Sequence, residues 1–417
     1  MTDLSVFSIP DLEPQVKKTE RKPAHEAVIV SAVRTAIGKF SGTLREVHPA
    51  ELGALCIKEA VGRAGLAPEE VDEVIMGNVV SAGLGQNPAR QAAIKAGLPV
   101  KVGAMTLNKV CASGLKSVVL AAQAVSGGDA EAVVAGGMES MSRTPYLITK
   151  ARSGIRMGHD QIIDSMIADG LWDPYHDFHM GFTGEIVAHH FNVSRGDQDE
   201  YAFRSHQKAV EAINRGKFND EIVAVPLVGK KGEVSAFSVD ESPRADTTVE
   251  KLASLRPAFL KEGTVTAGNS PGVNDGAAAL LVMAGDAAAS RGMKPIARIV
   301  NYFTSGLAPE WVMLTPIPAI RGVLAKNGGP SLGEIDLFEI NEAFSVQALA
   351  CIRELAIDQG KVNINGGAVA LGHPIGASGA RILVTLLHGL RARGGRYGIA
   401  SLCLGGGNGV AVLVEML

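Results

Sequence analysis

The sequence predicts an α/β enzyme made of two similar halves, and three observations support this fold class. Of its 417 residues, 46% are hydrophobic, only 5% are aromatic and 49 are glycine, a balance typical of closely packed α/β enzymes and not of disordered or fibrous chains. Strand-like and helical apolar segments alternate, as in a largely parallel sheet covered by helices. Part of this pattern recurs near the end of the chain, and the length exceeds one ordinary core.

Residues 1–25 differ from the rest. Prolines punctuate a polar stretch that carries the basic cluster Lys17, Lys18, Arg21 and Lys22. The stretch lacks the apolar core of a signal peptide, and its acidic residues do not fit an Arg-rich transit peptide. We expect a flexible extension, or an arm packed on the surface, without a chemical role.

The first copy of the α/β unit spans residues 26–142. Its helices are predicted from helical periodicity and its strands from short apolar runs. In order, the expected elements are a strand at 27–30, a helix at 50–64, a strand at 71–76, a helix at 90–96, a helix at 115–125, and a strand at 132–135 closed by Gly136-Gly137-Met138.

Cys111 precedes a turn of small residues, Ala112-Ser113-Gly114, at the entrance of the helix expected at 115–125. The free N–H groups and dipole of a helix N-terminus stabilise an anion, so this position predicts a thiol with a lowered pKa and a nucleophilic role. The alternative is a small buried hydrophobic residue, as most free cysteines are. The stretch by itself leaves both interpretations open.

The tripeptide Ala112-Ser113-Gly114 recurs as Ala377-Ser378-Gly379, and each copy opens an apolar helix that is followed by a strand ending in clustered glycines. We therefore expect a second copy of the unit over residues 295–417. Cys111 aligns with Gly376, so only the first half carries a thiol at this turn.

Residues 143–272 differ in composition from both copies and hold six of the ten histidines. We expect an inserted lid or binding subdomain, with its clearest amphipathic helix at 198–214. The pairs His176-x-x-His179 and His189-His190 could suggest a metal site, but they have no neighbouring cysteine and no HExxH pattern. Solvated or capping histidines are the favoured interpretation, without a metal.

Charge and cysteine usage narrow the function classes. The net charge of −3 provides no electrostatic case for a nucleic acid or an anionic membrane as partner. Cys56, Cys111, Cys351 and Cys403 are far apart and form no CxxC pair, which fits free thiols in a reducing compartment and predicts a cytoplasmic location. No apolar run approaches the ~18 residues of a membrane span.

Three stretches of the second half combine polar groups with glycines. Asn341-Glu342-Ala343-Phe344 follows an expected strand, where open parallel sheets place their sites; the simpler alternative is an Asn that turns the chain. His373 lies in a Gly-His-Pro sequence that aims its ring rigidly. Cys403 precedes Gly405-Gly406-Gly407, whose backbone N–H groups suit anion stabilisation, but the run does not fit GxGxxG and a dinucleotide site is rejected.

Together, these motifs resemble the thiolase family. The resemblance covers residue 26 to the C-terminus in the family's order and spacing, and it is closest to the short-chain, biosynthetic branch. Each motif alone would be a weak signal. The matching segments are Asn108–Gly114, Gly136–Met141, Gly263–Asn269, Asn341–Phe344, Asn365–Gly376 and Cys403–Gly407.

The resemblance implies a thiolase-like fold, two tandem α/β halves in five αβαβα layers, usually assembled as a homodimer or as a homotetramer made of two dimers. It places residues 26–142 plus 273–294 in the N-terminal half, residues 143–272 in an inserted loop domain that binds coenzyme A, and residues 295–417 in the C-terminal half. It implies no metal and no permanently bound cofactor, with coenzyme A and acetyl-CoA as substrates.

The implied reaction is ping-pong acyl transfer, in which two acetyl-CoA give acetoacetyl-CoA and coenzyme A, together with the reverse thiolysis. Cys111 matches the nucleophile, His373 its activating base, and Cys403 the acid/base at the α-carbon. Asn341 matches the residue that holds an oxyanion-hole water with the histidine. The backbone N–H groups of Cys111 and Gly405 match a second oxyanion hole.

The resemblance also implies substrate contacts. His179-Met180 match a pair beside the acyl-pantetheine, where Met180 would shorten the acyl pocket, and Arg244 or Lys251 could meet the nucleotide phosphates. At Pro271 the chain departs from the family, which commonly has there a serine that bonds the pantetheine amide. The other positions expected to line the coenzyme A site are Leu171, Phe259, Ala267, Gly268, Ser270, Met313 and Phe344.

Alternatives remain open on the sequence alone. A broad-range 3-ketoacyl-CoA thiolase of fatty-acid β-oxidation would share the catalytic residues. A decarboxylating ketoacyl synthase would normally have a second histidine where Cys403 stands. Outside enzymes, a catalytically inactive acyl-CoA-binding relative is disfavoured, because all four catalytic positions are filled.

Overall fold

The computed structural model describes residues 3–16, 24–229, 231–326 and 329–417 of the chain. The strands of its first half are β1 (Ala27–Thr35), β2 (Gly38–Lys39), β3 (Glu73–Gly77), β4 (Gly103–Leu107), β5 (Ala132–Ser140) and β13 (Asn274–Ala284). The helices of this half are α1 (Pro49–Ala64), α2 (Pro88–Lys95), α3 (Ser113–Gly127), α7 (Gly285–Ser290) and the 3-10 turn η2 (Pro68–Glu70). Six of these elements form where the sequence predicts them, with shifted boundaries: β1, α1, β3, α2, α3 and β5. The sequence did not predict β2, β4, β13 or α7.

The second half repeats this arrangement. Its strands are β14 (Ala297–Gly306), β15 (Leu337–Ile340), β16 (Tyr397–Leu404) and β17 (Asn408–Met416). Its helices are α8 (Pro316–Ala325), α9 (Ser345–Glu354), α10 (Ala368–Leu371) and α11 (Ile375–Arg393), with the 3-10 turns η6 (Pro309–Leu314), η7 (Leu332–Glu334) and η8 (Gln359–Lys361).

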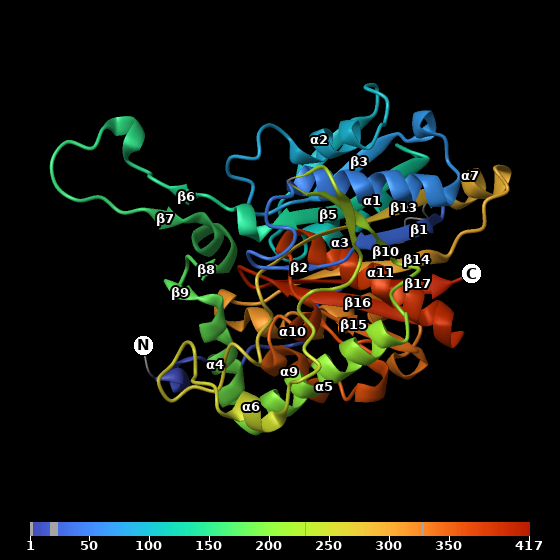
Figure 1. Ribbon diagram of the computed structural model, residues 1–417. Helices are drawn as coiled ribbons and strands as arrows, with labels where there is room; N and C mark the ends of the chain where they lie inside the picture. The colour runs from blue at the N-terminus through green and yellow to red at the C-terminus, as the bar shows by residue number, and fades with distance from the viewer. Residues whose placement is uncertain (1–2, 17–23, 230, 327–328) are drawn as a thin grey trace.

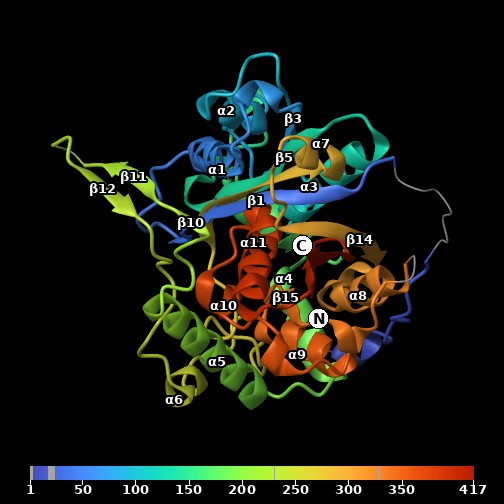
Figure 2. The ribbon, with the colours of Figure 1, turned by 90° about the vertical axis from the view of Figure 1, so that its right-hand side faces the viewer.

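Helices and strands alternate in five layers (Figure 1). α1 and α2 cover one side of the first-half strands, α3 and α11 lie between the two sets of strands, and α8 and α9 cover the far side of the second set. Figure 2 shows the same stacking from the side, with α11 in the middle. The predicted fold, two α/β halves in an αβαβα arrangement, is confirmed.

The sheet is mixed, so the expectation of a largely parallel sheet is wrong. Its strand order is β15-β16-β17-β14-β1-β13-β5-β3-β4, and only β15–β16, β3–β5 and β3–β4 pair in parallel along this path. The reason lies in the connections: β13 returns after a long inserted segment, and β16 and β17 form a hairpin, whereas parallel pairs need a crossover.

Glycines allow the two central helices to touch. A Cβ on Gly114 would lie 2.8 Å from the backbone nitrogen of Ala380, and one on Gly379 would collide with the backbone of Leu115. The glycine of each repeated tripeptide therefore serves the contact between α3 and α11.

Gly136 and Gly137 do not close their strand, contrary to the prediction. β5 continues through both residues to Ser140. They are glycines because a Cβ on Gly136 would strike the carbonyl of Ala278, and one on Gly137 that of Gly376. The pair marks close packing in the interior and not a strand end.

The inserted segment lies between β5 and β13 and is mostly loop. It holds η3 (Met141–Arg143), β6 (Tyr146–Leu147), η4 (Ala151–Ser153), β7 (Ile163–Asp164), the π-helical turn η5 (Ile167–Leu171), β8 (Trp172–Asp173), β9 (Phe178–His179), α4 (Met180–His190), α5 (Arg195–Asn214), β10 (Ile222–Val223), β11 (Val225–Val228), β12 (Val234–Phe237) and α6 (Val249–Ala253). The loop between β6 and β7 extends away from the body (Figure 1). α5 matches the predicted amphipathic helix.

Residues 3–16 form a packed arm and not a flexible extension. They begin with the 3-10 turn η1 (Leu4–Val6) and place the buried Leu12 in a hydrophobic cluster of the second half. Of the two expectations for this part, the surface-packed arm therefore holds. The basic cluster of residues 17–22 lies outside the described residues.

We expected no apolar run as long as a membrane span, but α3 and the residues before it form one of 18 residues. Val110–Gly127 is long and apolar enough to cross a membrane, by length and composition only. Most of this window is buried, because α3 lies between the two sets of strands. Its apolar character is that of a core helix.

Candidate active site

One cavity is lined by most of the residues selected from the sequence. The inserted segment contributes one part of its lining, and loops of both halves contribute the rest. Of the expected site residues it contains Cys111, His373, Cys403, Gly405, Leu171, His179, Met180, Phe259, Ser270, Met313 and Phe344.

Cys111 follows a strained residue. Val110 has a φ of 45°, a left-handed conformation that is unfavourable for a β-branched side chain. The hydroxyl of Ser113 holds the turn, because it accepts from the N–H of Lys109 at 2.8 Å and donates to the carbonyl of Val110 at 2.6 Å. The Val110 N–H donates to Asn108 at 2.9 Å. These bonds retain the strain and direct Cys111 into the cavity.

The thiol of Cys111 is not acidified, contrary to the prediction. The residue precedes the N-cap Ala112 and so lies outside the first turn of α3. Burial raises the pKa of Cys111 to about 12, and the backbone N–H groups of Gly405 and Cys111, which act in the opposite direction, do not offset it. The thiol is protonated at neutral pH and needs a base to become a nucleophile.

His373 has the geometry of that base. Its Nδ1 is 2.6 Å from the hydroxyl oxygen of Ser378, and this hydroxyl lies 2.9 Å from the carbonyl of Pro374, to which it donates. Because a serine hydroxyl has one proton, Nδ1 must be the donor to Ser378, which leaves the lone pair on Nε2.

The His373 ring is also neutral. Burial lowers the pKa of His373 to about 3, with the charge of Arg381 acting in the same direction. Nε2 is buried and has no hydrogen-bond partner among the residues that the structure describes. His373 therefore presents an unprotonated nitrogen that can accept the Cys111 proton.

Cys403 lies near the end of β16, and Asn341 directly follows the neighbouring strand β15. β15 and β16 run parallel with Ile340 opposite Ser401, so both residues reach the same edge of the sheet. Burial raises the pKa of Cys403 well above its ordinary value, and the nearby Cys111 adds to this shift. Cys403 is thus a protonated thiol beside the first one.

Asn341 is buried, and neither atom of its side-chain amide has a partner in the described part of the chain. Because buried polar groups are nearly always hydrogen-bonded, this amide is available to a bound group. Asn341 does not itself line the cavity, although its neighbours Ala343 and Phe344 do. It lies behind the lining at the end of β15.

The turn after β16 places the backbone of the glycine run Gly405–Gly407 close to Cys111. A Cβ on Gly405 would lie 3.4 Å from the Val110 side chain and 4.0 Å from the sulfur of Met180. Gly407 has a φ of 81° and passes close to the carbonyl of Leu307. The glycine run therefore lets a backbone N–H approach the Cys111 sulfur.

A buried carboxylate, Glu139, joins the two halves behind the cavity. It accepts hydrogen bonds from the side chain of Asn78 at 2.8 Å and from the backbone of Val79 at 3.0 Å, Val80 at 3.3 Å and Gly376 at 2.8 Å. Burial raises the pKa of Glu139 to about 7. Since Gly376 follows the histidine loop directly, Glu139 ties that loop to the first half.

Aromatic and sulfur side chains form another part of the cavity wall. His179 caps α4 through its Nδ1 and stacks on Phe259 with 4.7 Å between ring centroids. Phe259 meets Phe344 edge-on at 6.3 Å. Burial lowers the pKa of His179, so its ring is neutral. Met180 and Met313 complete this wall in the cavity that also holds the sulfurs of Cys111 and Cys403.

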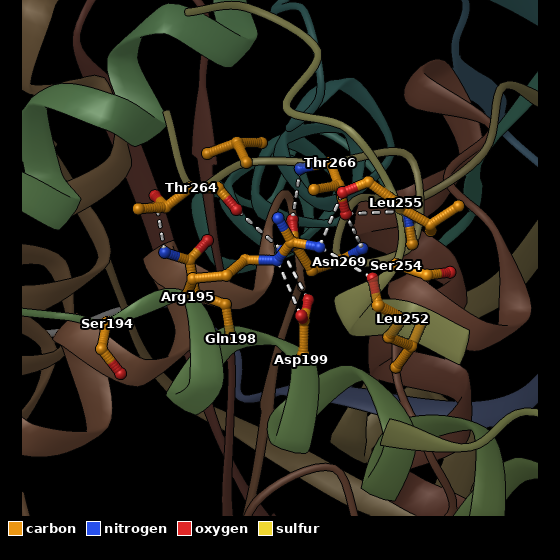
Figure 3. Close-up of polar contacts among 12 residues, drawn as sticks. Ser194, Arg195, Gln198, Asp199, Leu252, Ser254, Leu255, Thr264, Thr266 and Asn269 are labelled. Carbon is orange, nitrogen blue, oxygen red and sulfur yellow. Dashed lines mark hydrogen bonds and ion pairs between the residues drawn. The ribbon is translucent and has the colours of Figure 1, made fainter. Parts of the chain in front are cut away.

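A polar network holds the loop that leads to Ser270-Pro271-Gly272 (Figure 3). The Asn269 side chain donates to the carboxylate of Asp199 and to the carbonyl of Thr264, both at 3.0 Å. Arg195 binds Asp199 at 2.7 Å and two carbonyl groups near the end of α6. These bonds connect α5 and α6 to the loop and fix its position at the cavity.

Within this loop, Ser270 and Pro271 both line the cavity. The Ser270 hydroxyl donates to the carbonyl of Thr266 at 2.7 Å, so its proton is engaged while its oxygen can still accept. Pro271 offers no side-chain hydrogen bond. At this position the chain therefore has no side-chain group that could replace the family's serine.

Four expected contacts do not line the cavity. Arg244 and Ala267 are exposed, and the Lys251 ammonium binds Asp246 at 2.8 Å. Gly268 is buried, and a Cβ there would lie 2.5 Å from Leu255. Their contact with a nucleotide stays a prediction.

Two histidines of the inserted segment that could have suggested a metal site contact protein groups instead. His190 Nε2 lies 2.9 Å from the carbonyl of Leu4, and His176 lies 3.7 Å from Asp173. No group of three or more His, Cys, Asp or Glu that could hold a metal ion occurs in the described ranges.

Sequence reasoning missed Ser378 and Glu139. The repeat was the available signal for Ser378, because Ser113 and Ser378 occupy the same place in the two tripeptides and each holds a catalytic loop. Glu139 lies inside a matched motif and is a carboxyl residue in an otherwise apolar strand. That pattern could have marked it as buried and hydrogen-bonded.

Comparison with known proteins is consistent along the chain. Residues 27–286 match the family described as "Thiolase, N-terminal domain" and residues 293–416 match "Thiolase, C-terminal domain". The chain is 54% identical over 387 residues to the acetyl-CoA acetyltransferase of Pseudomonas aeruginosa, covering 93% of this chain and 98% of that protein. It is 54% identical over 391 residues to the Escherichia coli protein of that name, covering 94% and 99%.

A solved structure agrees. The crystal structure of the Bacillus anthracis acetyl-CoA acetyltransferase matches with a TM-score of 0.93 at 46% identity, covering 95% of this chain and 100% of that one.

Proposed function

The chain belongs to the thiolase family, and we propose that it is an acetyl-CoA acetyltransferase. It joins two acetyl-CoA molecules into acetoacetyl-CoA and coenzyme A, and it catalyses the reverse thiolysis. The observation that carries this proposal is the single cavity that contains Cys111, His373 and Cys403. The support from comparison is the match to relatives of that name over nearly their whole length.

In the first half-reaction, the Cys111 sulfur attacks the thioester carbonyl of acetyl-CoA. His373 Nε2 takes the thiol proton as the new C–S bond forms, and the proton then leaves with the coenzyme A thiolate. A neutral histidine and a thiol of raised pKa support this order, because charge forms only when substrate is bound. The product is acetyl-Cys111.

In the second half-reaction, Cys403 acts on the α-carbon of the second acetyl-CoA. His373 first accepts the Cys403 proton, and the Cys403 thiolate then removes the α-proton. The carbanion attacks the acetyl carbonyl, the C–S bond to Cys111 breaks, and the released Cys111 thiolate takes the proton that His373 holds. In thiolysis Cys403 protonates the departing carbon instead. Its raised pKa suits this acid role, because the thiol stays protonated between turnovers.

Two groups of hydrogen-bond donors stabilise the developing oxyanions. The N–H groups of Cys111 and Gly405 serve one carbonyl, supported by their approach to the Cys111 sulfur. The Asn341 amide, unpartnered among the described residues, serves the other, acting with His373. Two such sites suit a reaction in which two thioester carbonyls develop negative charge.

The acyl range is short. Met180 and Met313 line the cavity beside the sulfurs and leave little room for a longer chain. The pantetheine arm passes Leu171, Phe259 and the Ser270 loop. Arg244 and Lys251, outside the cavity, meet the nucleotide phosphates of coenzyme A.

We expect a homodimer or a homotetramer. β4 stands at the end of the strand order, and the loop between β6 and β7 carries exposed apolar side chains, among them Ile155, Met157 and Ile162. Edge strands and apolar arms are common assembly surfaces. Light scattering on the purified chain tests this expectation. The cytoplasmic location expected from the free cysteines stays a prediction.

The proposed roles are tested by trapping the acetyl group. Cys111→Ser should retain no label from labelled acetyl-CoA, whereas Cys403→Ala should become acetylated but form no acetoacetyl-CoA. Cys56→Ala, at a buried thiol remote from the cavity, is the matched control and should turn over normally. A Cys403→Ala enzyme that condenses at the normal rate would refute the assignment, and preferred thiolysis of long 3-ketoacyl-CoAs would favour the broad-range thiolase.

A further inference from the structure

The arm formed by residues 3–16 lies outside the family match, which begins at residue 27. The arm packs on the second half beside α4 and η6. These elements contribute to the acyl wall, by which we mean the cavity residues His179, Met180, Phe259, Met313 and Phe344. We propose that this arm clamps the acyl wall and so is a determinant of the chain-length range. The proposal rests on the proposed function, because the range is that of the thiolysis reaction.

The first contact is between Phe7 and His176. The two rings meet edge to face with centroids 6.2 Å apart. His176 in turn stacks on Phe178 at 5.4 Å, and its ring nitrogens lie 3.7 Å from the carboxylate of Asp173 and 3.6 Å from that of Glu310. His176 therefore links the turn that leads into α4 with η6, and Phe7 covers it on the arm side.

The second contact is made by Leu12, which is 8% exposed. It belongs to the hydrophobic cluster that also contains the cavity residues Met313 and Phe344. Arg321 of α8 donates to the Leu12 carbonyl at 3.2 Å and pairs with Glu13 at 3.1 Å. Leu12 is thus held from both its side chain and its backbone.

The third contact reaches α4. The ring of His190 lies 2.9 Å from the carbonyl of Leu4, with Nε2 as the contacting atom. Asp3 accepts from the N–H of Ser5 at 3.0 Å and from its hydroxyl at 2.6 Å, which shapes η1 for this contact. The arm therefore touches the C-terminal turn of α4 as well as the turn that precedes it.

These contacts act on both sides of the acyl pocket. Met180 starts α4, and Met313 lies in η6, so the two methionines of the wall come from the two elements that His176 joins. Flexible methionine side chains fill space according to the backbone that carries them. α4 and η6 also pack directly on each other, with the His190 and Trp311 rings 5.2 Å apart, so the arm adds to an existing contact. Without the arm, the turn that leads to Met180 loses its cover at His176, and the pocket can admit a longer acyl chain.

The test compares Phe7→Ala, Leu12→Ala and the double variant with Ile9→Ala. Ile9 lies on the same arm but is 57% exposed, so it is a matched control. We expect the ratio of kcat/KM for 3-ketohexanoyl-CoA to that for acetoacetyl-CoA to rise about 3- to 10-fold in the double variant, a part of what a pocket discriminates per methylene. Ile9→Ala should keep the ratio of the unaltered chain.

Hydrogen exchange provides a readout that does not depend on turnover. Peptides covering residues 173–180 and 309–314 should exchange faster in Phe7→Ala and in the double variant. Their exchange rates should be unchanged in Ile9→Ala. An unchanged exchange rate or an unchanged length ratio would overturn the clamp. If Leu12→Ala fails to fold, Phe7→Ala decides the question, because that ring is only partly buried.

Failure of the proposed function shows separately. If the unaltered chain does not transfer a labelled acetyl group to Cys111, the proposed function is wrong. If it does, and the arm variants leave both exchange and length ratio unchanged, only the clamp is wrong.

Discussion

Replacing Ser378 by alanine tests the protonation state assigned to His373. Ser378 accepts the Nδ1 proton at 2.6 Å and thereby leaves Nε2 free to act as base. In Ser378→Ala, the tautomer with the lone pair on Nε2 leaves a buried N–H without its partner, which costs about 1–3 kcal/mol. Since about 1.4 kcal/mol changes a rate tenfold, acetylation of Cys111 should slow roughly 5- to 150-fold.

The assay is the single-turnover rate of acetyl-enzyme formation from labelled acetyl-CoA, measured across pH. The rate should fall with little change in KM, because Ser378 acts through His373 and does not line the cavity. Ser117→Ala is the matched control: Ser117 is equally buried, lies on α3, and bonds Gly114 and Gly136 rather than a catalytic side chain. Equal acetylation rates in Ser378→Ala and the unaltered enzyme would refute the tautomer assignment.

Three further predictions concern the substrate and pH. Met180→Ala should raise activity on longer 3-ketoacyl-CoAs relative to acetoacetyl-CoA, by the ~1–3 kcal/mol that one methylene changes, and an unchanged profile would remove Met180 from the pocket. Pro271→Ser should lower KM for acetoacetyl-CoA several-fold, because the added hydrogen bond is worth about 0.5–1.5 kcal/mol. The kcat should stay nearly constant, because pantetheine is held alike in the ground and transition states. A KM that does not fall would mean that the Ser270 oxygen or a water already makes the bond. Because burial raises the pKa of Cys111 to about 12, its thiolate fraction should grow with pH. Iodoacetamide labelling of Cys111, followed by peptide mass spectrometry, should therefore accelerate from about pH 6 to about pH 10, and a plateau near neutral pH would contradict the neutral cysteine–histidine pair.

Local sequence signals predicted the principal elements of the first half, a few of the second half and the long helix of the inserted segment. The helices over residues 49–64 and 195–214 follow from apolar periodicity, and the strand over 337–340 from a short apolar run bounded by a polar turn. The prediction that a strand ends at Gly136-Gly137 was wrong. Here the two residues are glycines because the carbonyl groups of Ala278 and Gly376, from distant segments, leave no room for a Cβ. This steric constraint is set by the packing of distant segments, so the neighbouring sequence does not reveal it.

The catalytic residues could be selected from the sequence because their chemistry depends on residue type. Cys111, His373 and Cys403 were recognised from motifs, and one cavity contains all three. The residues that hold these catalytic groups in position could not be selected in the same way. Glu139 joins Asn78 to Gly376, and only the folded chain brings these partners together.

The sequence by itself determined the two-fold repetition, the alternation of strands and helices, and the identity of the reactive groups, because these depend on side-chain type and periodicity. Only the tertiary structure decided the charge state of those groups. The Cys111 thiol was expected to be acidic at a helix N-terminus, but its pKa is raised to about 12 because burial removes the water that would solvate a thiolate. Desolvation depends on every segment that closes around a group, so it cannot be read from the residues next to it.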